Sequence, residues 1–461
     1  MKIGKLLFVL ATGLICTMML SRFSLETVLI LFILIGASIS FRFPEKAICA
    51  YFILLPFFPF YLGVNFGLLG EINGVTMLNG VLLLPLFFKH FFGKVSKPKA
   101  NKELIKFDIL IILFLVLSSF YQLANFGFVV WKGEIWHYFI EYFLVYFIIT
   151  RYVITENMYG RILEFIIRGG CLFTLIGILD YVLEIRFYTK VVANIPARFL
   201  LSKDFGLIEN MRAGINRMQI SFGQPISLGV YLAVLLILTL VCFDKEFNLR
   251  KKLLYSLTAI LSSIGLVLTQ ARGPIMVSGF LLFLCFIFLK RIRLIVLSIG
   301  LVLSFTVFFI AMVLPSNTNR LVMDVLHENT GKLENANFRV ELYEDVISKI
   351  NRVSLIGENR NLYNSLRIRF QYDTVVWYIQ ILVNSGVVTL MLFLFLIGWV
   401  LKDVFLNFFK NGVVIVWPFL TLLTCFLTVS FVGQSVYYFW IFIGLSIASL
   451  TVFKPCKNAS I

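Results

Sequence analysis

Long apolar runs separated by short polar segments make up most of this chain. A membrane-spanning helix needs about 20 predominantly apolar residues, and runs near that length recur along the whole sequence. The runs predict spans at residues 5–21, 25–41, 47–63, 74–88, 107–123, 136–151, 161–183, 225–243, 253–269, 273–289, 294–314, 374–401, 413–432 and 436–453. Pro56 and Pro59 interrupt the third of these, and Glu141 interrupts the sixth. The pattern predicts an all-α polytopic membrane protein with about fourteen transmembrane helices.

Two polar segments are much longer than the other connections and divide the chain. They predict a first group of helices at 1–183, a first long loop at 184–224, a second group of helices at 225–314, a second long loop at 315–373, and a last group of helices with a tail at 374–461. Within the second loop, Leu342, Val346 and Ile350 recur at helical spacing. That spacing predicts an amphipathic helix on the membrane surface.

The composition excludes a water-soluble protein. Hydrophobic residues make up 60% of the chain and charged residues only 14%, whereas soluble domains average about 25% charged residues. In a soluble protein, the net charge of +17 would suit a nucleic-acid partner. Most of the cations lie instead in short connections between apolar runs, as membrane topology requires, so nucleic-acid binding is rejected.

The placement of Lys and Arg predicts the orientation in the membrane. With the N-terminus inside, the inner segments hold roughly 23 of these residues, and the short outer loops hold about 3, namely Arg22, Lys132 and Arg272. We therefore expect a multi-pass protein of a bacterial inner membrane, with both termini in the cytoplasm and both long loops in the periplasm. The first apolar run is taken as a helix, because no convincing cleavage site follows it.

The seven cysteines give no sign of a metal site or a disulfide. None of them lies in the two long loops, and no CxxC spacing occurs. Zinc sites and disulfide frameworks both depend on such groupings. We expect no metal and no other cofactor.

Both long loops are rich in arginine, whose planar guanidinium can donate two parallel hydrogen bonds to a phosphate. The first loop ends with Arg212 and Arg217 and enters the next helix through Phe-Gly-Gln-Pro225. A tight outer turn places Arg272 near a helix N-terminus, where the helix dipole favours anions. The alternative for such arginines is a solvated face, or contact with lipid phosphates.

The second loop contains a further set of polar residues. Arg339 lies four residues before Tyr343, and a Leu-Ile-Gly segment and Arg360 follow. The loop ends at Asp373, which opens a predicted span that contains Gly386. The alternative role of Asp373 is that of an N-cap interacting with the helix dipole.

These features, in this order, resemble the O-antigen polymerase and ligase superfamily. The likeness rests on the Arg-Gly turn between two helices, the Arg-rich loop ending in Phe-Gly-x-Pro, and the second loop with its Arg-x-x-x-Tyr and Leu-Ile-Gly motifs. It covers roughly residues 205–400. The resemblance implies a C-type glycosyltransferase fold and transfer of a saccharide from undecaprenyl diphosphate on the periplasmic side, without a metal.

The resemblance leaves three functions, which we rank. In the ligase branch a histidine opens the helix after the large loop, whereas this chain has Asp373 followed by Thr374. That departure favours a polymerase of O-antigen, capsular or exopolysaccharide repeats, in which a chain-length regulator is a further partner to consider. A ligase that transfers polymer to lipid A-core, completing lipopolysaccharide, is second. A lipid-linked oligosaccharide flippase is third, because the sequence shows no repeated halves.

The predicted site combines arginines from separate outer segments with one carboxylate. The residues predicted to bind the lipid diphosphate are Arg212, Arg217, Arg272, Arg339 and Arg360. Arg217 and Arg272 are further predicted to stabilise the charge that develops on the leaving diphosphate. Asp373 is predicted to accept the proton of the acceptor hydroxyl.

Several other polar residues have less specific interpretations. Glu141 and Asp180 are considered as partners for the outer arginines. Arg168 lies well inside a span, where charges are functional by default, although it can also reach back to the inner surface. His137 and His327 are more simply solvated histidines than catalytic ones.

Overall fold

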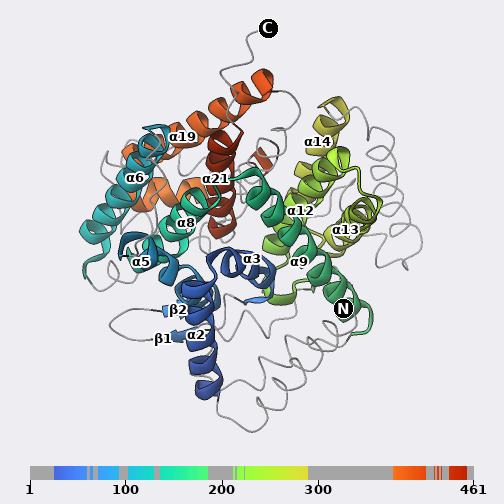
Figure 1. Ribbon diagram of the computed structural model, residues 1–461, viewed down its shortest axis with the longest axis horizontal. Helices are drawn as coiled ribbons and strands as arrows, with labels where there is room; N and C mark the ends of the chain where they lie inside the picture. Colours follow the sequence, from blue (N-terminus) through green and yellow to red (C-terminus); the bar gives the residue numbers. More distant parts are fainter. Residues whose placement is uncertain are drawn as a thin grey trace, which may run out of the picture.

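The computed structural model describes residues 25–59, 63–65, 71–92, 102–128, 135–184, 211–212, 215–222, 224–288, 377–411, 420, 423–424, 427 and 436–453. The predicted spans at 5–21 and 294–314 lie outside the described residues, as do nearly all of 413–432 and the whole of the second long loop. Within the described part the protein is mostly helical (Figure 1).

The helices follow the apolar runs closely. They are α2 (Leu25–Arg42), α3 (Pro44–Leu54), α4 (Gly74–Leu82), α5 (Leu84–Phe92), α6 (Lys102–Phe126), α8 (Leu144–Tyr152), α9 (Glu156–Val182), α12 (Pro225–Lys245), α13 (Leu249–Leu268), α14 (Arg272–Phe288), α19 (Trp377–Asn411) and α21 (Val436–Val452). Two short 3-10 helices, η1 (Leu55–Phe57) and η4 (Ile220–Phe222), and one π-helix, η2 (Tyr138–Phe143), complete the helical elements described.

Two small antiparallel strand pairs connect helices. β1 (Gly63–Asn65) pairs with β2 (Glu71–Asn73), which leads directly into α4. β3 (Met211–Arg212) pairs with β4 (Ile215–Asn216), ahead of η4 and α12.

Several helices have the length and the apolarity of membrane spans. Among the described residues, six helical segments qualify: Gly74–Phe92, Leu104–Tyr121, Glu156–Val182, Pro225–Lys245, Leu249–Leu268 and Ser385–Leu406. Shorter apolar helices cover Phe32–Arg42, Gly273–Phe286 and Tyr438–Val452. Their outer faces carry large apolar side chains such as Ile109 and Phe120, which are 58% and 59% exposed. A surface of this kind needs lipid as its solvent, which confirms the prediction of a polytopic membrane protein.

The third predicted span does not continue as one helix. α3 ends at Leu54, and η1 and β1 follow it in place of further α-helical turns. Pro56 explains the ending, because proline lacks the N–H that an α-helix needs and disfavours helical geometry in the residue before it. The sixth predicted span remains helical but includes the π-helix η2 around Glu141.

Polar contacts between helices define two ends of the bundle. We call the end that holds η4 and the α13–α14 turn the turn end. There Ser221 donates a hydrogen bond of 2.5 Å to the carbonyl oxygen of Pro56, and Ser118 lies 3.0 Å from Ser385 between their hydroxyl oxygens. We call the opposite end the cation end. There Arg151 pairs with Asp108.

Further ion pairs at the cation end show how the helices alternate. Arg161 of α9 lies 3.6 Å from Glu45 at the start of α3, and Lys251 of α13 lies 3.0 Å from Glu164 of α9. Hence α3, α6, α9 and α13 run from the cation end to the turn end, and α4–α5, α8, α12 and α14 run back. In Figure 1, β1 and β2 lie low in the view, and the ends of α14 and α19 lie near its top. Each described segment therefore has the direction that the Lys and Arg count requires.

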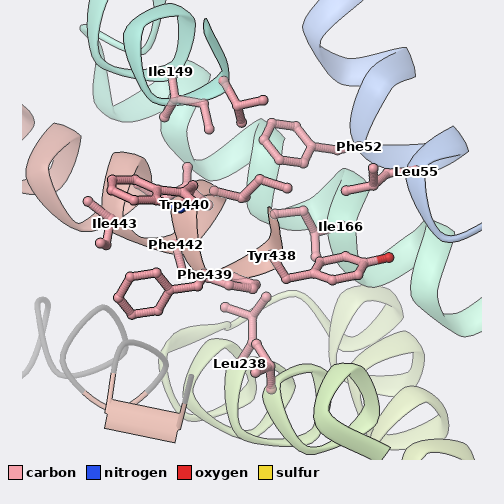
Figure 2. Close-up of a cluster of buried hydrophobic side chains, with 14 of the residues drawn as sticks. Phe52, Leu55, Ile149, Ile166, Leu238, Tyr438, Phe439, Trp440, Phe442 and Ile443 are labelled. Atoms are coloured by element: carbon pink, nitrogen blue, oxygen red, sulfur yellow. The ribbon is translucent and has the colours of Figure 1, made fainter. Parts of the chain in front are cut away.

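The core of the bundle is built around α21. Trp440 is fully buried and its ring stacks on that of Tyr142, with centroids 5.4 Å apart. Figure 2 shows Trp440 and Ile443 between Ile149 on one side and Leu238 on the other. α21 thus joins the N-terminal helices to α12, and this arrangement holds the separate helix ends in fixed positions.

Candidate functional site

The strand pair β3–β4 brings two of the predicted arginines together. Arg212 pairs in register with Ile215, and Met211 pairs with Asn216. Paired residues in an antiparallel ladder lie about 4.5–5.5 Å apart between Cα atoms. Arg217 directly follows β4, so the hairpin folds the backbone of Arg212 back beside the segment that ends in Arg217.

Arg217 attaches this segment to the turn between α13 and α14. Its Nε donates a hydrogen bond of 2.9 Å to the carbonyl oxygen of Thr269. The neighbouring backbone reinforces the contact, because Met218 N donates to the carbonyl oxygen of Leu268 at 3.1 Å. The end of the first long loop is therefore docked on the turn by both a side chain and the main chain.

The turn itself has a defined backbone. Thr269 ends α13, with its N–H bonded to the carbonyl of Gly265 at 3.0 Å. Gln270 has a φ of 52°, in the left-handed region that reverses the chain after a helix. α14 then begins at Arg272, three positions after the residue that Arg217 contacts. Arg212, Arg217 and Arg272 are thus brought to one place at the turn end by their backbones.

Glycines allow the loop and the turn to pack closely against the helices. A Cβ on Gly177 of α9 would lie 1.9 Å from Ile220 Cδ1, and one on Gly229 of α12 would lie 3.0 Å from Ala271 Cβ. Cβ atoms do not approach other atoms as closely as the first of these distances. The small residues therefore set how deeply η4 and the turn sit between α9, α12 and α13.

The remaining predicted site residues lie outside the described residues. These are Arg339, Arg360 and Asp373, together with His327. The description resumes at Trp377, and α19 is interrupted at Gly386, whose φ of 82° and ψ of 174° are not helical. The start of α19 lies at the turn end, because Ser385 contacts Ser118 there.

A buried polar cluster around Glu141 was not assembled from the sequence. Glu141 accepts hydrogen bonds from Asn73 Nδ2 at 2.7 Å and from the Thr76 hydroxyl, and its Oε1 lies 3.0 Å from His137 Nδ1. Asn73 also caps α4, through a bond of 2.8 Å from Thr76 N. The cluster therefore ties the strand pair β1–β2 to η2 at the turn end.

These contacts correct the suggestion that Glu141 pairs with an outer arginine. Its described partners are a histidine, an asparagine and a threonine. The signal in the sequence was a carboxylate inside an apolar run with a histidine four residues before it, one helical turn away on the same face. Arg168 likewise has a local partner, because it is exposed and pairs with Glu164 in its own helix.

The described residues offer no set of metal ligands. No group of three or more His, Cys, Asp or Glu among them is placed to hold a metal ion. The chemistry that these residues can support is the binding of an anion by the arginines of the turn end.

Comparison with known proteins identifies one matching family. Residues 257–394 match the family described as O-antigen ligase. The matched segment starts inside α13, contains the turn with Arg272, includes Arg339, Arg360 and Asp373, and ends within α19. No curated protein and no solved structure matches the chain. The resemblance inferred from the motifs is confirmed for this segment.

Proposed function

Because residues 257–394 place the chain in the O-antigen ligase and polymerase superfamily, we propose that it is a polysaccharide polymerase. It joins oligosaccharide repeat units carried on undecaprenyl diphosphate into O-antigen, or into a capsular or exopolysaccharide, on the periplasmic face. The observation that supports this most is the hydrogen bond between Arg217 and Thr269, because it gathers arginines from two separate segments at one end of the bundle.

The proposed architecture has fourteen spans, a C-type glycosyltransferase arrangement and both termini in the cytoplasm. Its five segments are those delimited in the sequence at residues 183, 224, 314 and 373. α14 runs toward the cation end beside α12, and α19 starts at the turn end. The chain between them must therefore change ends, which supports a span at 294–314. The turn end then faces the periplasm of a bacterial inner membrane.

The proposed chemistry is a single displacement at the anomeric carbon of the donor sugar. The acceptor hydroxyl oxygen forms the new bond to that carbon, and the bond from the carbon to the diphosphate oxygen breaks. The electron pair leaves with the lipid diphosphate, whose charge Arg217 and Arg272 stabilise, while Arg212, Arg339 and Arg360 bind its oxygens. Asp373 accepts the proton of the hydroxyl. A single displacement inverts the configuration at the anomeric carbon.

The choice of polymerase over ligase rests on Asp373. The ligase branch resembles a pattern with histidine at the opening of that helix, and this chain has Asp373 and Thr374 there. A ligase that transfers polymer to lipid A-core, or to another acceptor, is the second candidate, because the matched family is described by that activity. A chain-length regulator is a proposed partner of the polymerase only.

Deletion of the gene separates these functions when the glycans are resolved on a gel. A lost polymerase leaves single repeats on the acceptor, and a lost ligase leaves finished polymer on the lipid carrier. Loss of all surface glycan is the result for a flippase and would contradict both enzymatic functions.

A variant of the turn tests the site directly. Arg272→Ala is expected to abolish chain growth while the protein still inserts in the membrane. Arg250→Ala is the matched control, because Arg250 is an exposed arginine in the first turn of α13, at the cation end. Polymers of normal length in Arg272→Ala would refute the proposed role.

A further inference from the structure

A cavity of about 520 Å³ lies at the cation end, away from the proposed chemistry. It is formed by α9, α12 and α13, which Figure 1 shows close together, and by the end of α21. The residues that line it are Glu156, Asn157, Tyr159, Gly160, Arg161, Leu163, Glu164, Val241, Cys242, Lys245, Glu246, Lys251, Tyr255 and Phe453. A volume of this size is typical of sites for small molecules or headgroups, for which about 300–1,000 Å³ is usual.

Most of the charged side chains in this cavity already have partners. Glu164 pairs with Arg168 and lies 3.0 Å from Lys251. Glu246 accepts hydrogen bonds from two backbone N–H groups, at 3.0 Å and 3.1 Å. Arg161 lies 3.6 Å from Glu45. The charges of these groups are therefore balanced within the protein.

Lys245 differs from the other cations of the cavity. It is the last residue of α12, and its Nζ is buried without a hydrogen-bond partner among the described residues. An ammonium group held away from water without hydrogen bonds is costly. An anionic group in the cavity would supply the missing acceptor. The C-terminus of α12 also favours the positive charge at this position.

The surroundings of the cavity indicate where such an anion comes from. The cavity wall combines polar groups with the apolar side chains of Leu163, Val241 and Phe453. Along α9, the face that follows Gly160 and Glu164 continues as exposed leucines, of which Leu172 is 50% and Leu179 is 47% exposed. In a spanning helix such a face contacts acyl chains. The cavity is thus placed where a lipid headgroup meets its hydrocarbon tails.

We propose that this cavity binds the phosphate of an anionic phospholipid, with Lys245 as its main ligand. The site lies at the opposite end from the arginines of the turn, so it is independent of the sugar chemistry. Lys251 and Arg161 at its rim add positive potential that a zwitterionic headgroup does not exploit.

Native mass spectrometry of the full-length protein in detergent tests the proposal. Phosphatidylglycerol or phosphatidylcholine is added in equal amounts, and the bound lipid is counted. The protein is expected to retain phosphatidylglycerol preferentially, and Lys245→Gln is expected to lower that binding about fivefold, to the level of phosphatidylcholine. Lys252→Gln is the matched control, because Lys252 lies at the same end over the Phe243 ring, outside the cavity lining.

Two further arms decide the remaining cases. Lys245→Arg keeps the charge and is expected to keep phosphatidylglycerol bound, which separates loss of the ligand from loss of the fold. Glycerol phosphate is added to the unaltered protein as a competitor. Displacement of phosphatidylglycerol by an equal concentration of glycerol phosphate would overturn the lipid assignment, and undiminished binding in Lys245→Gln would overturn the site.

Discussion

Arg217 and Thr269 are 52 positions apart in the sequence, yet the Nε of Arg217 donates a hydrogen bond of 2.9 Å to the Thr269 carbonyl oxygen. The bond joins the end of the first long loop to the turn that begins α14. It fixes the position of an arginine next to the segment with Arg272, and the main-chain bond from Met218 to Leu268 prevents the loop from moving away. The proposed anion site thus depends on a contact that the backbone already stabilises.

Removal of the Arg217 guanidinium is expected to stop polymer growth. Arg217→Ala loses both the charge and the bond to Thr269, and a lost transition-state donor costs roughly 100-fold or more in rate. Arg217→Lys keeps a charge but lacks the Nε donor and the planar fork, so we expect it to recover only part of the activity. The measurement is the rate of polymer formation in membranes supplied with lipid-linked repeats, normalised to the amount of inserted protein. Full activity in Arg217→Ala would exclude the residue from the site.

The contact between Asn73 and Glu141 is expected to stabilise the fold. Glu141→Gln replaces an acceptor of several hydrogen bonds with a group that also donates, and leaving buried partners unsatisfied costs about 1–3 kcal/mol. Asn73→Ala removes the donor that lies 2.7 Å from the carboxylate. Because the two residues share one bond, their costs in the double variant should sum to less than the two single costs.

Thermal unfolding of the detergent-purified protein measures these effects. Glu45→Gln serves as the control, because the Glu45 carboxylate is 68% exposed and 3.6 Å from Arg161. An exposed pair of this kind contributes only about 0–1 kcal/mol. Strictly additive costs for Asn73→Ala and Glu141→Gln would show that the bond contributes nothing.

Two glycines of α9 form a matched pair for testing helix packing. A Cβ on Gly169 would lie 2.9 Å from the Cα of Ile53 and 3.1 Å from its carbonyl oxygen, so Gly169→Ala forces α3 and α9 apart. We expect a loss of about 1–3 kcal/mol in the free energy of unfolding. Gly160 has nothing within 4 Å of the position of a Cβ. Gly160→Ala should be neutral or stabilise the protein by up to about 1 kcal/mol, through its higher helix propensity. Equal unfolding midpoints for the two variants would contradict the close contact at Gly169.

Local sequence was sufficient to predict most of the helices but not the contacts between them. The apolar runs predicted α9, α12 and α13 to within a few residues, because in a membrane the length of an apolar run sets the length of its helix. Pro56 was recognised as an interruption, although the end of α3 at Leu54 and the strand after it were not predicted.

The tertiary contacts of the site have no local signal. Glu141 and Asn73 are 68 positions apart, and their bond depends on how η2 packs against α4. The convergence of Arg217 with the turn was anticipated only as a consequence of assuming a shared ligand. The bond of its Nε to a backbone carbonyl is a structural role that the sequence could not indicate. The parts played by Arg339, Arg360 and Asp373 stay predictions.

The orientation of the bundle can be tested with two introduced cysteines. Gln270 lies in the α13–α14 turn at the turn end, and Asn248 is exposed at the cation end, where it caps α13. If the turn end faces the periplasm, a membrane-impermeant thiol reagent applied to cells with a permeabilised outer membrane should label Gln270→Cys and leave Asn248→Cys unlabelled. After disruption of the inner membrane, both should react. The unaltered protein controls for the native cysteines, of which Cys49, Cys171 and Cys285 are buried. Labelling of Asn248→Cys in the intact cells, with Gln270→Cys protected, would place the arginines of the turn in the cytoplasm and remove the basis of the proposed periplasmic reaction.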